Sequence, residues 1–143
     1  MISTVDIMKL TLQKAMSEEG KIDAIYLSTS EANPILTVSK TKMEPAVASV
    51  VSAVMAKLGY MGTESLDKGE LEVVYVKARN GYIFIRSINK DIIMTVSTRK
   101  DAPIGLLLFT VENIAERVNK VISTVEVKTS LTEESTQLAE IIK

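Results

Sequence analysis

Between residues 71 and 98 the chain alternates apolar, β-branched runs with short polar turns. The dipeptide Asn80-Gly81 separates two of these runs, and such a dipeptide is typical of a two-residue type I′ turn between antiparallel strands. A third run, residues 92–98, follows the polar turn at residues 89–91. The pattern therefore predicts a three-stranded antiparallel meander.

A loop formed by Asn80 and Gly81 determines which residues of the hairpin share a face. On one face aromatic residues alternate with cations, in the pairs Arg79 with Tyr82, Lys77 with Phe84, Tyr75 with Arg86, and Val73 with Ile88. The other face is aliphatic, with the pairs Ala78 with Ile83, Val76 with Ile85, and Val74 with Ser87, and we expect it to be deeply buried. The first face is either covered, with its Lys and Arg stems reaching toward the edge, or a recognition surface.

The residues before the meander predict a helix and two strands. Residues 3–19 place apolar side chains on one helical face, with Ser3 or Thr4 as N-cap and Gly20 as the stop. These apolar residues are Val5, Met8, Leu12, Ala15 and Met16. The polar face of this helix is mixed in charge, which disfavours a membrane-surface role. Residues 22–28 and 35–38 read as strands, and Pro34 fits the start of the second, where a missing N–H costs little.

A second helix is expected from about Glu44-Pro45 to Gly59, since proline fits the first turn and Thr41 with Glu44 has capping-box spacing. It has a broad apolar stripe, as on a helix that packs against a core, made of Val47, Val50, Val51, Val54, Met55 and Leu58. Beside the stripe lies a line of small residues, namely Ala46, Ser49, Ala53 and Ala56. Small side chains allow another backbone to approach closely, so this line packs either a second copy of the helix or the chain's own sheet.

Asp101 as N-cap and Pro103 in the first turn predict a third helix that runs to about Ile122. Its buried side is formed by Ile104, Leu107, Leu108, Val111, Ile114, Ala115, Val118 and Ile122. Residues 125–143 are expected to begin as an extended piece and to become helical from about Ser130. We therefore predict a domain of residues 1–124 and a C-terminal extension of residues 125–143, which docks on the body, binds something else or frays.

Taken in order, these elements define an α+β fold with a five-stranded antiparallel sheet between helices and a C-terminal helical tail. The length of 143 residues suits one domain, and an apolar share of 46% argues against disorder. No apolar run approaches the length of a membrane span, and the N-terminus has no signal-peptide pattern. We therefore expect a cytoplasmic protein without membrane insertion.

Composition excludes several kinds of chemistry. The chain has no cysteine and no histidine, which rules out disulfides, thiolate metal sites, cysteine nucleophiles and the Ser-His-Asp arrangement. The glycines form neither a phosphate loop nor a dinucleotide-binding pattern. The carboxylate pairs Glu18-Glu19 and Glu133-Glu134 are interpreted as helix-end or solvated residues. We predict no catalytic residue, no metal site and no cofactor.

Two roles for the cations remain open from the residues alone. Any of Arg79, Arg86, Arg99 and Arg117 could act in trans on the phosphates of a partner. The segment from Arg79 to Ile85 is also similar to the aromatic strand of an RNA-recognition motif. Ile83 stands where that motif has Gly or Ala, the order of elements differs, and a net charge of −1 gives no general attraction to phosphate backbones. Nucleic-acid binding is therefore not expected.

The segment from Glu70 to Asn119 carries a strand, an Asn-Gly hairpin, a third strand and a Gly-Leu-rich helix, in the runs Glu72-Val73-Val74-Tyr75-Val76, Asn80-Gly81-Tyr82-Ile83-Phe84-Ile85-Arg86, Met94-Thr95-Val96 and Ala102-Pro103-Ile104-Gly105-Leu106-Leu107-Leu108. This succession resembles the second half of a Roadblock/dynein light chain domain, and the helix from Pro45 to Leu58 matches the family's central helix. The resemblance covers roughly residues 3–122. Asn33-Pro34-Ile35 departs from it, because an Asp-Gly turn and an apolar strand are usual there.

The resemblance implies a profilin-like, non-enzymatic homodimerisation module that serves as a scaffold or regulator for a Ras-like small GTPase or for a larger complex such as a dynein motor. Carried onto this chain, the self-association surface would comprise Ala46, Ser49, Val50, Ala53, Lys57, Val73, Tyr75 and Lys77. An edge strand left unpaired is a liability that dimerisation removes. Candidates for contact with a further partner are Tyr82, Phe84 and Arg86.

Two other function classes are compatible with the sequence. A small-ligand sensor module of profilin-like fold is the alternative, although the sequence offers no convergent polar groups for a ligand. A role in activating GTP hydrolysis on a partner stays open. Which GTPase is bound, whether oligomers larger than a dimer form, and what the C-terminal extension contacts are not determined by the sequence.

Overall fold

The computed structural model describes the backbone of residues 3–142 and the side chains of residues 3–124. Its elements are α1 (Thr4–Glu18), β1 (Ile22–Thr29), β2 (Pro34–Ser39), α2 (Pro45–Ser65), β3 (Val74–Ala78), β4 (Gly81–Ser87), β5 (Ile92–Arg99) and α3 (Ile104–Ile142). This order is the predicted one, and the α+β, profilin-like fold class is confirmed. Pro34 is the first residue of β2, as expected.

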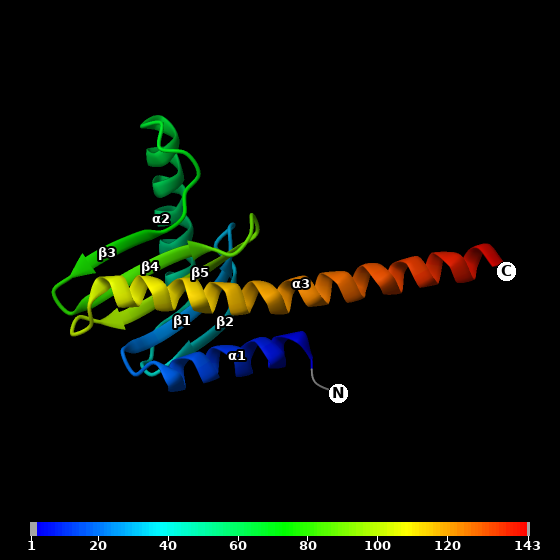
Figure 1. Ribbon diagram of the computed structural model, residues 1–143, viewed down its shortest axis with the longest axis horizontal. Helices are drawn as coiled ribbons and strands as arrows, with labels where there is room; N and C mark the ends of the chain where they lie inside the picture. Colours follow the sequence, from blue (N-terminus) through cyan, green and yellow to red (C-terminus); the bar gives the residue numbers. More distant parts are fainter. Residues whose placement is uncertain (1–2, 143) are drawn as a thin grey trace.

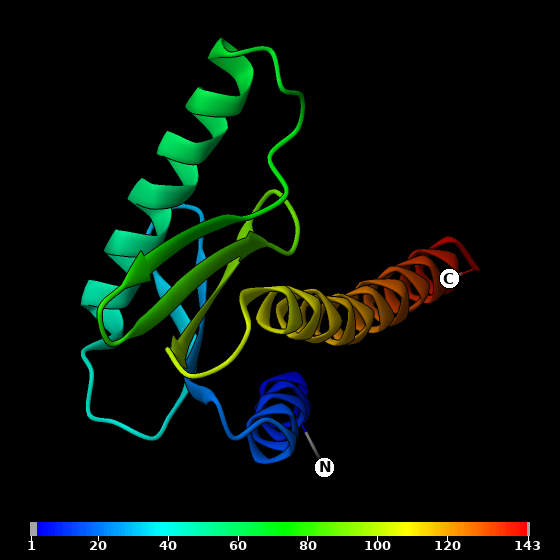
Figure 2. The same cartoon turned by 60° about the vertical axis from the view of Figure 1, so that its left-hand side comes forward.

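One antiparallel sheet organises the molecule. Its strands lie in the order β2-β1-β5-β4-β3, so β2 and β3 are the two edges. Figure 2 shows α2 on one face of the sheet and α1 with α3 on the other. The main core lies between the sheet and α1 with α3, where Leu12, Ile25, Phe84, Val96 and Val118 have no exposed surface.

The start of α1 is capped as the sequence predicts. The Ser3 hydroxyl accepts a hydrogen bond from the Asp6 N–H at 3.2 Å, and the Ser3 N–H donates to the Asp6 carboxylate at 3.2 Å. This reciprocal pair is a capping box, which satisfies two N–H groups that the first helical turn leaves free. The hydrogen bonds from Ser3 lower the pKa of Asp6.

The β3–β4 hairpin has a different turn from the predicted one. Ala78 pairs with Gly81, so the loop residues are Arg79 and Asn80, and Tyr75 lies opposite Phe84 rather than Arg86. Asn80 does not have the positive φ that a type I′ turn requires, since among the described non-glycine residues only Ala32 and Asp67 have one. Each residue of β3 lies opposite the residue of β4 that is two positions before the predicted partner. Because a shift of two positions keeps each side chain on its side of the sheet, the division of residues between the two faces is unchanged. Gly81 is instead required by close packing, since a Cβ there would lie 2.0 Å from the Thr98 carbonyl oxygen.

The second helix continues past Gly59, where the sequence predicted its end, and stops at Ser65. A Cβ on Gly59 would lie 2.4 Å from a methyl group of Val74, so this glycine allows α2 to approach the start of β3. The helix ends where Asp67 adopts a left-handed conformation with φ 56°. Its N-cap is Glu44 without a side-chain cap, so the predicted capping box of Thr41 and Glu44 is absent.

The third helix is longer and begins differently than expected. The Pro103 carbonyl accepts the first hydrogen bond, from the Leu107 N–H at 3.1 Å. Asp101 is not the N-cap, because its carboxylate pairs with Lys21 at 2.7 Å and Arg99 at 3.4 Å. The backbone is helical from Ile104 to Ile142, so the predicted extended piece after residue 125 and a separate helix start at Ser130 are wrong. The helix runs far past the sheet (Figure 1), and the domain boundary at residue 124 stays a prediction.

A candidate self-association surface

The side of α2 that faces the sheet is formed by small residues. Ala48, Ser49 and Ser52 are buried, and each serine hydroxyl donates to a carbonyl one turn back, Ser49 to Pro45 at 2.8 Å and Ser52 to Ala48 at 2.6 Å. The Ser52 hydroxyl is also hydrogen bonded to that of Thr95 on β5. Since Ser52 uses its proton on Ala48, Thr95 is the donor of this bond. The small residues thus hold α2 close to the sheet.

The sheet face under α2 carries small and polar residues on β1, and buried aliphatic residues, Ile85 and Ile93, on β4 and β5. Ala24 and Tyr26 of β1 form a buried cluster with Ala48. Burial raises the pKa of the Tyr26 phenol. The opposite face of the same strand carries Ile25 and Leu27, which belong to the main core. The short side chains of α2 pack directly on the sheet face under α2.

As a result the apolar stripe of α2 points away from the protein. Val47, Val50, Val51, Val54 and Leu58 are each between 43% and 62% exposed. We expected this stripe to pack against a core. It does not pack against the chain's own sheet, so that expectation is wrong. The line of small residues packs against the sheet instead, with Ser49 buried and Ala53 and Ala56 half-buried. Such a continuous exposed aliphatic surface is uncommon on an unpartnered soluble domain.

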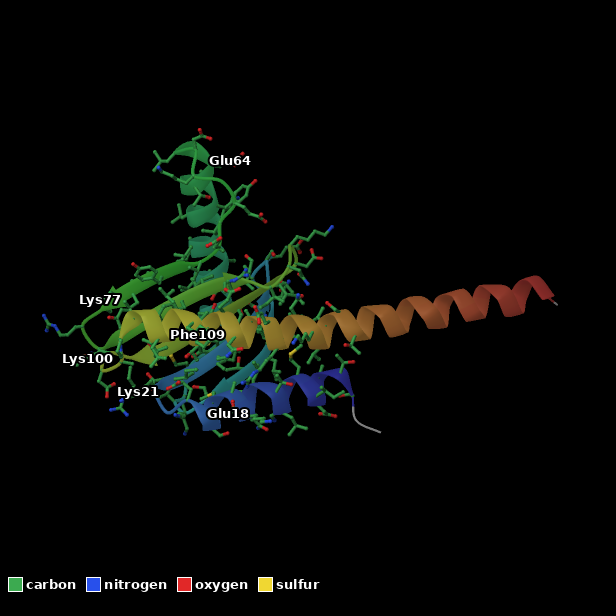
Figure 3. All side chains as sticks on the ribbon, viewed as in Figure 1. Glu18, Lys21, Glu64, Lys77, Lys100 and Phe109 are labelled. Carbon is green, nitrogen blue, oxygen red and sulfur yellow. The ribbon has the colours of Figure 1, made fainter. Side chains whose placement is uncertain are left out.

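The edge strand β3 extends this aliphatic surface. Its outer side has no strand partner, and Tyr75 and Val76 are 50% and 38% exposed. Val74 touches α2 near Gly59, so Val76 and Ala78, which share its face, lie on the α2 side of the sheet. This face of the hairpin was predicted to be deeply buried, which holds for Ile85 but not for Val76 or Ala78. Lys77 points outward from the sheet (Figure 3).

Of the predicted self-association residues, Ala46, Val50, Ala53 and Lys57 lie on α2. Tyr75 and Lys77 lie on the edge strand β3, but on the sheet face opposite α2, where the Tyr75 ring is 6.1 Å from the ring of Phe84. Ala46, Lys57 and Lys77 are exposed, Val50 and Tyr75 are about half exposed, and Ala53 and Val73 are half-buried. Ser49 is fully buried against the sheet, out of reach of a second molecule. Sequence reasoning missed Val47, Val51, Val54 and Leu58 as surface residues. The small and polar residues at alternate positions of β1 and β5 were the signal that could have identified them.

The residues predicted to contact a further partner lie under α3. Tyr82 is buried and Phe84 has no exposed surface, and their rings stack with centroids 5.8 Å apart. Arg86 donates two hydrogen bonds to Glu112 of α3, at 2.9 and 3.0 Å. These bonds raise the pKa of Arg86 and lower the pKa of Glu112. The β4 half of this face is therefore covered, whereas Tyr75, Lys77 and Arg79 on the β3 side are exposed.

The remaining arginines differ in how they are engaged. Arg99 and Arg117 form ion pairs with Asp101 and Glu18, at 3.4 and 3.0 Å. Arg79, in the β3–β4 turn, is exposed and has no ion pair within the described side chains. Residues 3–124 contain no cluster of three Asp or Glu side chains suited to a metal ion.

The length and composition of α2 also allow a different role. Over 18 residues its mean hydropathy is 1.3, which is enough to cross a membrane by these two criteria alone, and 17% of that window is buried. The expectation that no segment reaches this length and hydropathy is therefore wrong. The absence of membrane insertion stays a prediction.

A five-stranded antiparallel sheet with one helix on one face and two on the other defines the fold of Roadblock/LC7 domains and of profilin-like proteins. Solved structures share this fold across most of their length. Myxococcus xanthus MglB superimposes with a TM-score of 0.74 at 8% identity, covering 82% of this chain and 96% of that one. A structure titled "MglB with tetrameric arrangement" gives 0.73 at 11% identity, with 83% and 90% covered.

A Roadblock/LC7 domain from Streptomyces avermitilis gives a TM-score of 0.71 at 10% identity, with 80% of this chain and 96% of that one covered. The resemblance to the Roadblock fold is therefore confirmed. No family model and no curated protein matches the sequence. At these identities the likeness establishes the fold, while the function has to be argued from the surface of this chain.

Proposed function

We propose that this chain is a regulatory or scaffold module that pairs with a second copy of itself through α2 and β3 and then holds a Ras-like small GTPase. The observation that carries the proposal is the aliphatic stripe of α2, which is exposed beside the unpaired strand β3. A twofold mate would cover both features at once, because β3 could add to β3 of the second copy while the α2 stripes pack against each other.

The chemistry of the surface favours a protein mate over solvent. The stripe contains five aliphatic residues. The only charged residues of α2 are Lys57 and Glu64. Glu64 lies at the far end of the helix, away from the sheet (Figure 3). Burial of an exposed Val or Leu side chain contributes about 1.5 kcal/mol or more, so two such stripes supply a large driving force.

The test of self-association is the mass of the purified protein at micromolar concentration by sedimentation equilibrium. We expect twice the chain mass of 15.7 kDa. Val54→Arg should give the monomer, because it places two like charges in an apolar interface. Val54 is 53% exposed, so the variant keeps the fold. Gln13→Arg, on the exposed side of α1, is the matched control and should stay dimeric.

The alternative occupant of the stripe is a lipid surface. Flotation with vesicles of phosphatidylcholine and phosphatidylglycerol distinguishes it from a second copy. A monomeric wild type that floats with vesicles, and loses this on Val54→Arg, would overturn the pairing proposal.

The GTPase part of the proposal is supported only by the Roadblock fold. It is tested with a purified Ras-like GTPase from the same organism, loaded with GDP or with a non-hydrolysable GTP analogue. We expect binding that depends on the nucleotide and a changed hydrolysis rate. Arg79→Lys asks whether the exposed arginine acts on phosphates, since it keeps the charge but loses the bidentate geometry. If the chain binds the GTPase in neither nucleotide state, the GTPase assignment is contradicted. The proposal of self-association is not affected by that result.

A further inference from the structure

Three segments of the chain meet at one end of the sheet. Gly81, the first residue of β4, lies opposite Arg99, the last residue of β5. The Arg99 N–H donates to the carbonyl of Lys21, just before β1, at 2.8 Å. Figure 3 shows Lys21, Lys77 and Lys100 at this end of the molecule. We call it the basic end, and its cations are Lys21, Lys77, Arg79, Arg99 and Lys100.

Positive charge exceeds negative charge at the basic end. The carboxylates that lie among its five cations are Glu19, Asp23 and Asp101. The chain as a whole has a net charge of −1, so the positive excess is local. Asp101 pairs with two of the cations, Lys21 at 2.7 Å and Arg99 at 3.4 Å, and so satisfies both from inside the molecule.

The other three cations are available to an external anion. Lys77, Arg79 and Lys100 are exposed, and none of them has an ion pair within the described side chains. Lys77 lies on the same face of β3 as the exposed Tyr75, at the open part of the face on which aromatic residues alternate with cations. This part of the face is therefore the one that can serve for recognition.

The position of these cations favours a flat array of anions. Lys77 and Arg79 belong to the β3–β4 hairpin and Lys100 to the turn before α3, so they stand on the turns at the tip of the molecule (Figure 3). A bilayer surface can contact all three from one side. A rod-like nucleic acid curves away from a projecting tip, and it binds best along a groove that follows its backbone.

Two large apolar side chains are exposed next to the basic end. Leu106 and Phe109 of α3 are 52% and 68% exposed. The helix starts at Ile104, so both lie within about 8 Å of its start along the axis. Exposed apolar residues beside lysine and arginine are typical of surfaces that settle at the boundary between lipid headgroups and acyl chains. The phosphate backbone of a nucleic acid offers them no such environment.

We propose that the basic end binds the surface of a bilayer that contains anionic lipids. Lys77, Arg79 and Lys100 contact the headgroup phosphates, and Leu106 and Phe109 enter the headgroup boundary without spanning the membrane. Each basic residue near an anionic surface raises the binding constant about fivefold, so three of them contribute on the order of a hundredfold. This attraction is screened by salt.

The inference goes beyond the proposed function and does not depend on pairing. Lys77 projects from the sheet face opposite α2, whereas pairing uses the backbone edge of β3 and the α2 stripe. The basic end is therefore present on a single chain and on a pair alike.

The experiment is co-sedimentation of the full chain with vesicles, either of phosphatidylcholine alone or of phosphatidylcholine with phosphatidylglycerol. We expect binding to the mixed vesicles at low salt, much weaker binding to phosphatidylcholine alone, and release from the mixed vesicles on addition of NaCl. No binding to the mixed vesicles, or equal binding to both kinds, would overturn the inference.

Charge variants locate the contact. The basic-end variant combines Lys77→Gln, Arg79→Gln and Lys100→Gln and should bind the mixed vesicles at least about tenfold more weakly. The control combines Lys9→Gln, Lys68→Gln and Lys90→Gln, which are exposed elsewhere and remove the same charge, and it should bind as the wild type does. Unchanged binding in the basic-end variant, or an equal loss in the control, would contradict the inference.

Two further outcomes would assign the surface differently. If Val54→Arg abolishes vesicle binding while the basic-end variant keeps it, the lipid contact lies on the α2 stripe and the inference is wrong. A short single-stranded RNA and a duplex RNA are titrated at the same salt concentration. Tighter binding to either RNA than to the mixed vesicles, lost in the basic-end variant, would overturn the inference in favour of nucleic acid. Phe109→Ser should weaken vesicle binding, which a purely electrostatic contact would not show.

Discussion

Two glycines show how single residues determine the packing of the sheet. Gly59 lets α2 come close to Val74, and Gly81 lets β4 come close to the backbone of β5. The second contact is the more demanding, because the neighbour is a carbonyl oxygen of the backbone and cannot rotate away. Tertiary structure determines a close approach of this kind. The sequence therefore shows that a glycine is present, but not which contact requires it.

Gly81→Ala should therefore destabilise the protein by about 2 kcal/mol or more, since the strands must separate to admit a Cβ. Urea unfolding measures the change. The control is Gly105→Ala on α3, where a Cβ meets nothing within 4 Å. That variant should be stabilised by up to about 1 kcal/mol, because glycine is unfavourable in a helix. Equal effects at the two positions would contradict the packing described for Gly81.

The ion pair of Arg86 and Glu112 predicts a dependence of stability on pH. The hydrogen bonds from Arg86 hold the pKa of Glu112 below its ordinary value in the folded state. A lowered pKa means stabilisation that is complete above the unfolded pKa, about 4.3, and is lost as the pH falls through the folded pKa. Because half of the Glu112 side chain is exposed, we expect less than about 1 kcal/mol.

Glu112→Gln removes this titration. Its unfolding free energy should decline less steeply than that of the wild type below about pH 4.3, as measured by urea unfolding at several pH values. Glu64→Gln, which removes an exposed carboxylate on α2 far from Arg86, serves as the control for the loss of one negative charge. Parallel curves for wild type and Glu112→Gln would show that the ion pair contributes nothing.

Among the elements, α2 is the one on whose orientation the proposed pairing depends. Its small residues face the sheet and its aliphatic residues face outward, the reverse of an ordinary amphipathic helix. The cluster of Ala48 with Ala24 and Tyr26, and the hydrogen bond of Ser52 with Thr95, hold this side of the helix against the sheet. The hydrophobic pattern of the helix alone could not show this.

Enlarging the inward side of α2 should be costly. Ser52→Leu forces a large side chain against β5 and breaks the bond with Thr95, and we expect a loss of about 2–3 kcal/mol in unfolding free energy. Val51→Leu adds one methylene to the neighbouring exposed position and should change stability by less than about 0.5 kcal/mol. The opposite ranking would mean that the apolar stripe, and not the small face, packs on the sheet.

The sequence predicts an element correctly where interactions between residues close in the chain form it, and fails where contacts with distant elements form it. The cap at Ser3, the start of β2 at Pro34 and the strands of the meander depend on local patterns, and the structure has them where expected. The end of α2, the turn at Arg79-Asn80 and the start of α3 depend on contacts with other elements.

At the scale of the whole molecule, the two edges of the sheet differ. The β2 edge begins with Pro34, which lacks an N–H and discourages pairing with another strand. The β3 edge has no proline and lies beside the exposed stripe of α2. This asymmetry favours β3 as the edge for the proposed pairing with a second copy.

The most direct measurement is disulfide cross-linking of single-cysteine variants along β3, which is possible because the chain has no cysteine of its own. The variants on β3 are Tyr75→Cys, Val76→Cys, Lys77→Cys and Ala78→Cys, and Thr37→Cys on β2 is the control. Each purified variant is oxidised mildly, and monomer and dimer are then separated without reductant. Twofold pairing of β3 predicts efficient dimer formation at the position nearest the axis, where the Cα atoms come within about 7 Å, and a decline on either side. Cross-linking along β3 that is uniform, or no faster than at Thr37→Cys, would contradict the account.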